Sequence, residues 1–240
     1  MLKKIMIPAL LGSVVVGLLP ENAAFADQVT TVTDSTYSTQ SITPDITPDI
    51  TQVITPSIIG MKRISDVPDF DWGRGCTISS AAMIIKYWES HGYPLLIDRG
   101  VSDDELQDII ADKYLHPDPD GSVSTGRAAI GFENYLKDRG YIYSFKADSF
   151  YSSSSYERIW KMITEEINAG RPLWLFMNRY QDGRRSVEGG HAVVIVGYKQ
   201  NASGQERKLI LHTTWKDGNV DYEWRPSDFS LVYKIKLGSK

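Results

Sequence analysis

The chain contains one cysteine, Cys76, and its surroundings are typical of a nucleophile. It follows Gly75 in the segment 72–76, Trp-Gly-Arg-Gly-Cys, and stands where a predicted helix over residues 77–90 begins. A helix N-terminus presents unpaired amides and the positive end of the helix dipole, which stabilise a thiolate and lower its pKa. Gly75 has no side chain and is expected to leave the approach to the sulfur open. The alternative is a buried cysteine that only packs as a small apolar side chain.

A histidine that could act as the base, His191, directly precedes an apolar run over residues 192–198. A buried strand would fix the imidazole, and Gly189 and Gly190 before it would let a substrate backbone pass close by. A structural core histidine is the alternative. The other three histidines are assigned elsewhere: His91 and His116 to surface turns, and His212 to the face of a strand opposite Leu211 and Thr213.

The order of the predicted elements defines the fold class. Helical periodicity and helix-end signals predict helices over residues 77–90, 102–115, 127–139 and 154–170. Two of these open on capping boxes, Ser102 with Glu105 and Ser154 with Glu157. Short apolar or alternating runs then predict strands over residues 173–177, 191–198, 208–215, 219–224 and 230–237, with a shorter one over 141–145. Helices followed by strands indicate an α+β fold in which an antiparallel sheet packs on a helical half.

Composition excludes several classes of protein. The 240 residues contain 26 Lys and Arg against 30 Asp and Glu, a net charge of −4. This balance argues against a nucleic-acid partner and against a basic membrane-surface protein. A single cysteine rules out an intramolecular disulfide framework and a zinc site built on several thiolates. We expect no cofactor and no metal.

The N-terminal 26 residues predict a secretory signal peptide. Lys3 and Lys4 precede an apolar run over residues 5–19, and Ala24 and Ala26 supply the small residues at a cleavage site. A membrane anchor is the alternative, but 15 residues are fewer than the roughly 20 that cross a bilayer. The protein is therefore expected to be secreted, without a membrane span after cleavage.

Residues 27–60 have the composition of a linker. Nine Thr, four Ser and three Pro occupy 16 of its 34 positions, and it contains no Lys, Arg or Glu. Repeated prolines favour an extended, semi-rigid spacer. A propeptide and an arm that docks on the domain are alternatives. The remaining residues, 61–240, are long enough for one domain with a well-filled core.

Two segments together resemble the papain-fold cysteine peptidases. They are residues 71–88, Asp-Trp-Gly-Arg-Gly-Cys-Thr-Ile-Ser-Ser-Ala-Ala-Met-Ile-Ile-Lys-Tyr-Trp, and residues 190–198, Gly-His-Ala-Val-Val-Ile-Val-Gly-Tyr. Within that group they are most similar to the branch of the bacteriocin-processing, double-glycine-leader peptidases. The resemblance implies a papain-like fold, with Cys76 as the nucleophile and His191 as the general base and acid.

The sequence departs from this family at two places. The third catalytic residue, an Asn or Asp in the family, falls at Thr213, and Asp217 after the following turn is a second candidate. The glutamine that donates to the oxyanion is replaced by the segment 69–71, Asp-Phe-Asp, which has no amide side chain. The donors would then be the Cys76 amide together with the Trp72 indole or Arg74.

These observations predict a secreted cysteine peptidase that cleaves peptide or amide bonds in a peptide or protein substrate. Two alternatives use the same scaffold. An acyltransferase or cross-linking enzyme would pass the acyl group from Cys76 to an amine. A catalytically inactive binding module would account for the missing glutamine and the missing acidic or amide third residue.

Overall fold

The computed structural model describes residues 58–238. The predicted signal peptide, 1–26, and most of the predicted linker, 27–60, lie outside the described residues. The first strand, β1 (Ile58–Arg63), begins inside the segment predicted as linker and pairs antiparallel with β4 (Ser186–Asn201). In residues 58–238, no helix is both long and apolar enough to cross a bilayer.

The helical half is formed by three helices that follow the predicted order: α1 (Cys76–Ser90), α2 (Asp103–Ile109) continued by a π-helical segment (Ile110–Leu115), and α3 (Thr125–Asp138). The capping box at the start of α2 is confirmed, because Ser102 accepts from the Glu105 amide and the Glu105 carboxylate accepts from the Ser102 amide. Burial extends around most of α1, which lies between the other helices and the sheet. This position sets the direction in which the N-terminus of α1 presents Cys76.

The fourth helix, α4 (Tyr156–Asn168), begins differently from the prediction. A 3-10 turn, Ser153–Ser155, precedes it, and Ser155 at the N-cap makes no capping bond through its side chain. The predicted capping box of Ser154 and Glu157 is therefore wrong. Arg207 binds both carboxylate oxygens of Glu157, at 2.7 and 2.9 Å, so this carboxylate is drawn to the sheet instead of the helix start.

Seven strands form one antiparallel sheet, as expected for the second half of the chain. Its order is β2-β7-β3-β4-β5-β6, and β1 pairs with β4 outside this path. The strands not yet given are β2 (Ile142–Ser149), β3 (Leu173–Gln181), β5 (Arg207–His212), β6 (Val220–Glu223) and β7 (Phe229–Gly238). All predicted strands are present, with bounds that differ by a few residues; β1 was not predicted.

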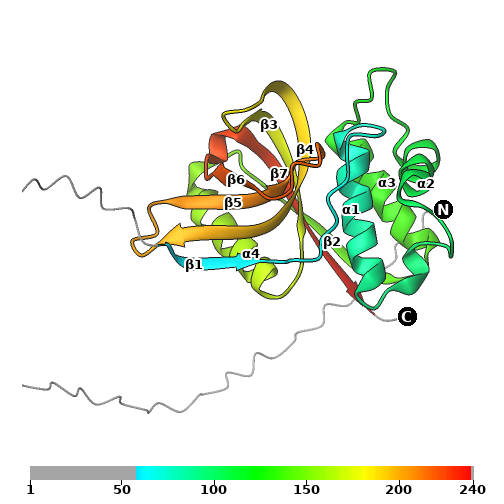
Figure 1. Cartoon of the computed structure of the whole chain (residues 1–240), viewed down its shortest axis with the longest axis horizontal. Coiled ribbons are helices and arrows are strands. Elements are labelled where there is room, and N and C mark those ends of the chain that lie inside the picture. Colours follow the sequence, from blue (N-terminus) through cyan, green and yellow to red (C-terminus); the bar gives the residue numbers. More distant parts are fainter. Residues whose placement is uncertain (1–57, 239–240) are drawn as a thin grey trace, which may run out of the picture. The chain divides into compact units, whose positions relative to one another are not determined.

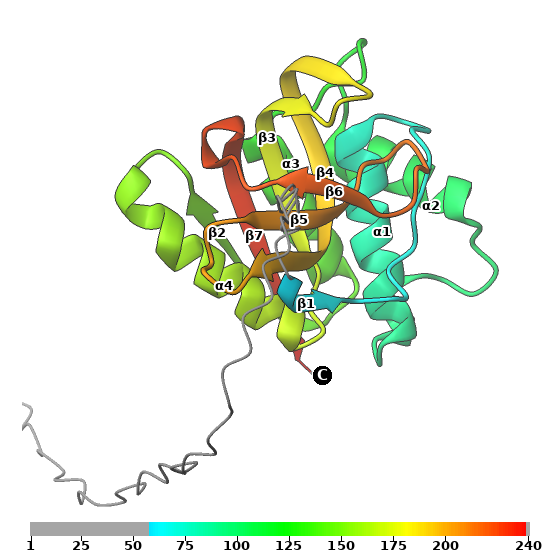
Figure 2. The same ribbon diagram turned by 60° about the vertical axis from the view of Figure 1, so that its left-hand side comes forward.

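Figures 1 and 2 show α1, α2 and α3 grouped on one side of the sheet and α4 on another. A buried hydrogen bond of 2.7 Å from the Trp174 indole to the Ser80 hydroxyl joins β3 to α1. Apolar side chains of both halves form one continuous core. The α+β class is confirmed, and the junction between α1 and the sheet is where the two predicted reactive residues meet.

Candidate active site

Cys76 is the first residue of α1 and is half-buried. The residue before it, Gly75, has φ +108°, and a Cβ there would lie 2.6 Å from the carbonyl oxygen of Gly121. Only glycine fits this position without strain. The Gly121 carbonyl occupies the space where a side chain at position 75 would be, so this close approach accounts for the glycine.

His191 lies inside β4 and not at its beginning, since β3 and β4 continue past it as a hairpin. Opposite Asn178 of β3, both Gly189 and Gly190 occupy β4, which makes a β-bulge. The φ of Gly189 is +97°, a value that glycine adopts without cost. The two glycines therefore kink the strand beside the imidazole, and a Cβ at either would meet no atom within 4 Å.

The structure brings Cys76 and His191 together in one pocket of about 250 Å³. The backbone amide of Ala192, the residue that follows His191, lies near enough to the sulfur to lower the pKa of the Cys76 thiol. Hence the predicted nucleophile comes from the helical half and the predicted base from the sheet, and both line the same cavity.

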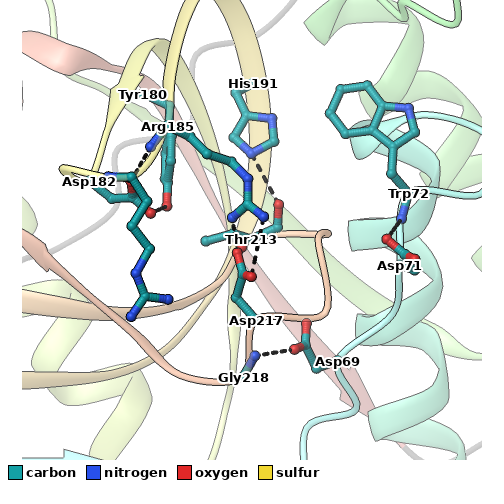
Figure 3. A network of polar contacts seen from close by, with 11 residues as sticks. Asp69, Asp71, Trp72, Tyr180, Asp182, Arg185, His191, Thr213, Asp217 and Gly218 are labelled. Carbon is teal, nitrogen blue, oxygen red and sulfur yellow. Dashed lines mark hydrogen bonds and ion pairs between the residues drawn. The ribbon is translucent and has the colours of Figure 1, made fainter.

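The hydrogen bonds of His191 define its tautomer. Its Nε2 lies 3.1 Å from the backbone carbonyl oxygen of Thr213, which can only accept, so Nε2 carries the proton. The other ring nitrogen, Nδ1, is buried without a hydrogen-bond partner. It lies on the side of the ring that faces Trp72 in Figure 3. A neutral imidazole in this tautomer offers a free lone pair at Nδ1, as a general base requires.

The two candidates for the third catalytic residue, Thr213 and Asp217, make different contacts. Thr213 does hold His191, but through its carbonyl, while its hydroxyl oxygen is buried without a partner. Asp217 is bound by Arg185, whose guanidinium also lies over the Trp215 ring at 4.7 Å. The Asp217 carboxylate therefore binds the hairpin of β3 and β4, through Arg185, and not the imidazole (Figure 3).

Three aromatic rings enclose the imidazole. Trp215 stacks on it at 4.4 Å between ring centroids, Trp72 is nearly parallel at 5.9 Å, and Tyr180 meets it edge-on at 5.2 Å. His191 is 1% exposed. Burial among these rings lowers the pKa of His191 to about 4, and the Thr213 carbonyl opposes this shift only partly. The ring is accordingly neutral at pH 7.

The pKa of the Cys76 thiol is raised, although its position at a helix start predicted the opposite. Burial is the largest cause, and hydrogen bonds from the amides of Ala192 and Thr77 offset only part of it. Desolvation disfavours the charged form of any acid, and here it outweighs the helix N-terminus. The resting pair is therefore a thiol beside a neutral imidazole.

The two side chains predicted as oxyanion donors, Arg74 and Trp72, lie in different surroundings. Both terminal nitrogens of Arg74 are bound outside the pocket, to Asp108 and Asp112 at 2.6 Å each. Trp72 remains beside the imidazole and is 43% exposed. Its backbone amide donates to the Asp71 carboxylate at 2.8 Å, so this aspartate helps to fix the backbone at Trp72.

A bracing contact that sequence reasoning missed holds the loop after β5. The Asp69 carboxylate accepts from the Gly218 amide at 2.7 Å, and the His212 ring lies 3.0 Å from the carbonyl oxygen of Pro68. Within this loop Thr214 and Lys216 have φ of +69° and +56°, in the left-handed region that non-glycine residues seldom adopt. The segment before α1 thus ties down the loop whose carbonyl orients His191. In the sequence, Gly218 is the one residue whose type could have indicated a tight turn at this contact.

Comparison with known proteins identifies the family. A family model described as the Peptidase_C39 like family matches residues 58–236. Among solved structures, UfSP from C. elegans is similar over 75% of this chain and 35% of that chain, with 15% identity and a TM-score of 0.44. The chain thus spans about a third of that neighbour's length. No curated protein sequence matches.

The family match covers both the helix that begins at Cys76 and the sheet that carries His191, in the order expected of a papain-like fold. The chain belongs to the Peptidase_C39-like family and has the α+β fold of a papain-like cysteine peptidase.

Proposed function

We propose that this protein is a cysteine peptidase that hydrolyses peptide or amide bonds with Cys76 as nucleophile and His191 as general base and acid. One observation carries the proposal. The buried Nδ1 of His191 has no partner, and its ring lines the same pocket as the Cys76 sulfur. A buried polar atom without a hydrogen bond is costly, and at an active site it is explained by a reacting partner.

The pKa values of the two groups determine how the reaction begins. Because burial favours both neutral forms, a thiolate is scarce before substrate binds. The thiol proton moves to Nδ1 of His191 as the sulfur attacks the substrate carbonyl carbon, and the carbonyl π electrons move to its oxygen. The backbone amide of Cys76, at the N-terminus of α1, is the donor that we assign to this oxyanion.

The remaining steps return the site to its resting state. The oxyanion collapses, the C–N bond breaks, and the imidazolium gives its proton to the leaving amine. Water then attacks the thioester while His191 takes a proton from it, and the C–S bond breaks as that proton returns to sulfur. Throughout, the Thr213 carbonyl keeps the Nε2 proton and the ring orientation fixed.

The test is hydrolysis of a broad peptide mixture by the full chain, followed by mass spectrometry. Cys76→Ala is expected to abolish cleavage, and His191→Gln to lower kcat/KM by roughly 10²–10⁴-fold, the usual contribution of a general base. His116→Asn is the matched control, because His116 is exposed and has φ +48°, which asparagine accepts. Cleavage that survives Cys76→Ala would refute the proposal.

Two other outcomes of this experiment identify the alternatives. Product in which an added amine replaces water would make the protein an acyltransferase. An inactive binding module is supported by the absence of a carboxylate or side-chain amide at Nε2 of His191, where Thr213 supplies a backbone carbonyl. Peptides retained by the protein without cleavage and without an acyl adduct on Cys76 would establish that alternative.

We also propose that the protein is exported, because residues 1–26 have the organisation of a signal peptide. The exported form is expected to begin at Asp27. N-terminal sequencing of protein from the culture medium tests this, and an intact Met1 or exclusively cytoplasmic protein would contradict it.

A further inference from the structure

We infer that the pocket beside Cys76 takes one uncharged, apolar side chain from the acyl part of the substrate. The inference rests on the proposed function and names the class of substrate for that site. It follows from what lines the pocket, from where the neighbouring charges are bound, and from the size of the cavity.

No Asp, Glu, Lys or Arg is among the described residues that line this pocket. The imidazole of His191 is neutral at pH 7. Val123, Phe176 and Met177 supply apolar surface, and the last two are almost fully buried. Around them stand uncharged polar side chains that can bind the substrate backbone: Ser122, Ser124, Thr125, Asn178 and Ser230.

Cations carried by the same elements are already paired. Arg127 of α3 binds Asp118 at 3.0 Å, and Arg179 of β3 binds Glu188 at 3.3 Å. A charged substrate side chain in the pocket would lose water and find no free counter-charge on these walls. Burial of an unpaired charge is strongly unfavourable, whereas an apolar side chain gains free energy by leaving water.

The volume limits the size of the side chain. About 250 Å³ is below the roughly 300–1,000 Å³ typical of sites for drug-sized ligands. The space suits one apolar side chain, such as that of leucine or methionine, together with its peptide group. Met177 can adjust its rotamer to branched and unbranched side chains, because its thioether is flexible.

The experiment compares kcat/KM for fluorogenic peptides that differ only in the residue before the scissile amide: Ala, Leu, Met, Lys or Glu. Leu and Met are expected to exceed Lys and Glu by at least about tenfold, and to exceed Ala by a similar factor. Ser230→Asp is expected to raise the Lys/Leu ratio about tenfold or more, and Ser230→Lys to raise the Glu/Leu ratio equally. Ser230 is half-buried and lines the pocket, so both variants introduce a charge at its wall.

Ser227→Asp is the matched control, because Ser227 is exposed three residues earlier and lies outside the pocket lining. It should leave all ratios unchanged at physiological ionic strength. Equal cleavage of charged and apolar peptides, or ratios that ignore the charge at position 230, would overturn the inference and leave the peptidase intact. Failure to cleave any peptide, with no acyl adduct on Cys76, would refute the proposed function and this inference with it.

Discussion

Replacing His191 by glutamine should remove an acid-dependent loss of stability that the enclosed imidazole causes. In the unfolded chain a histidine binds a proton below its ordinary pKa of about 6.5, but in the folded protein His191 does so only below about 4. The unfolded state therefore binds more protons between these values. The folded state loses stability as the pH falls from 6.5 to 4, and the loss does not increase further below that window.

The magnitude follows from the two pKa values. Over the whole window the linkage amounts to roughly 3 kcal/mol, and between pH 7 and pH 5 to about 2 kcal/mol. The imidazole is 1% exposed, so solvent screening does not reduce this figure substantially. His191→Gln removes the titrating group, while its side-chain amide can still donate to the Thr213 carbonyl.

The assay is urea unfolding of the wild type and the variant at pH 7, 6 and 5. The difference between their free energies of unfolding should change by about 2 kcal/mol in favour of the variant from pH 7 to pH 5. Other titrating groups are common to both proteins and cancel in the comparison. His116→Asn, at an exposed site, should follow the wild type. Parallel curves for wild type and His191→Gln would refute a neutral, enclosed imidazole.

Three further changes test the assignments of individual contacts. Asp217→Asn should lower kcat/KM for peptide cleavage by less than about tenfold, since Asp217 binds Arg185 and not the imidazole; a loss as large as that of a general base would contradict this. Gly131→Ala should cost about 1–3 kcal/mol in thermal unfolding, because a Cβ there overlaps the Tyr114 carbonyl oxygen of the neighbouring π-helical segment. Ser102→Ala should cost about 1 kcal/mol by urea unfolding, and Ser155→Ala clearly less, because only the first makes a side-chain capping bond.

The sequence was sufficient for features that depend on local patterns. Helical periodicity and the capping box at Ser102 predicted the helical half, and alternation with turn residues predicted the strands. The approach of Cys76 and His191 was predictable because segments 71–88 and 190–198 together resemble the papain-fold cysteine peptidases. Among the strands of residues 58–238, only β1 was missed, since its residues, 58–63, follow a Thr- and Pro-rich segment that has the composition of a linker.

Features that depend on long-range contacts were not accessible to sequence reasoning. The direction of the Cys76 pKa was predicted from the helix end alone, but burial against β4 decides it. The sequence left Asp217 as a candidate partner of the imidazole, but Arg185, 32 positions earlier, binds it instead. The sequence could not show whether the carbonyl or the hydroxyl of Thr213 binds His191, because every residue has a backbone carbonyl and the residue type does not reveal its contacts.

His191 is held by a backbone carbonyl and not by a carboxylate, and this difference affects the relative rates of the proposed steps. A carboxylate would stabilise the imidazolium by its charge, whereas the Thr213 carbonyl stabilises it only through its dipole. An imidazole with a pKa near 4 is a weak base toward the Cys76 thiol, but its protonated form is a strong acid toward the leaving amine. Sulfur attack should then be slower than loss of the amine. Thioester hydrolysis also begins with His191 as the base, so both slow steps depend on the low basicity of one ring, and that basicity is set by Trp72, Tyr180 and Trp215 around it.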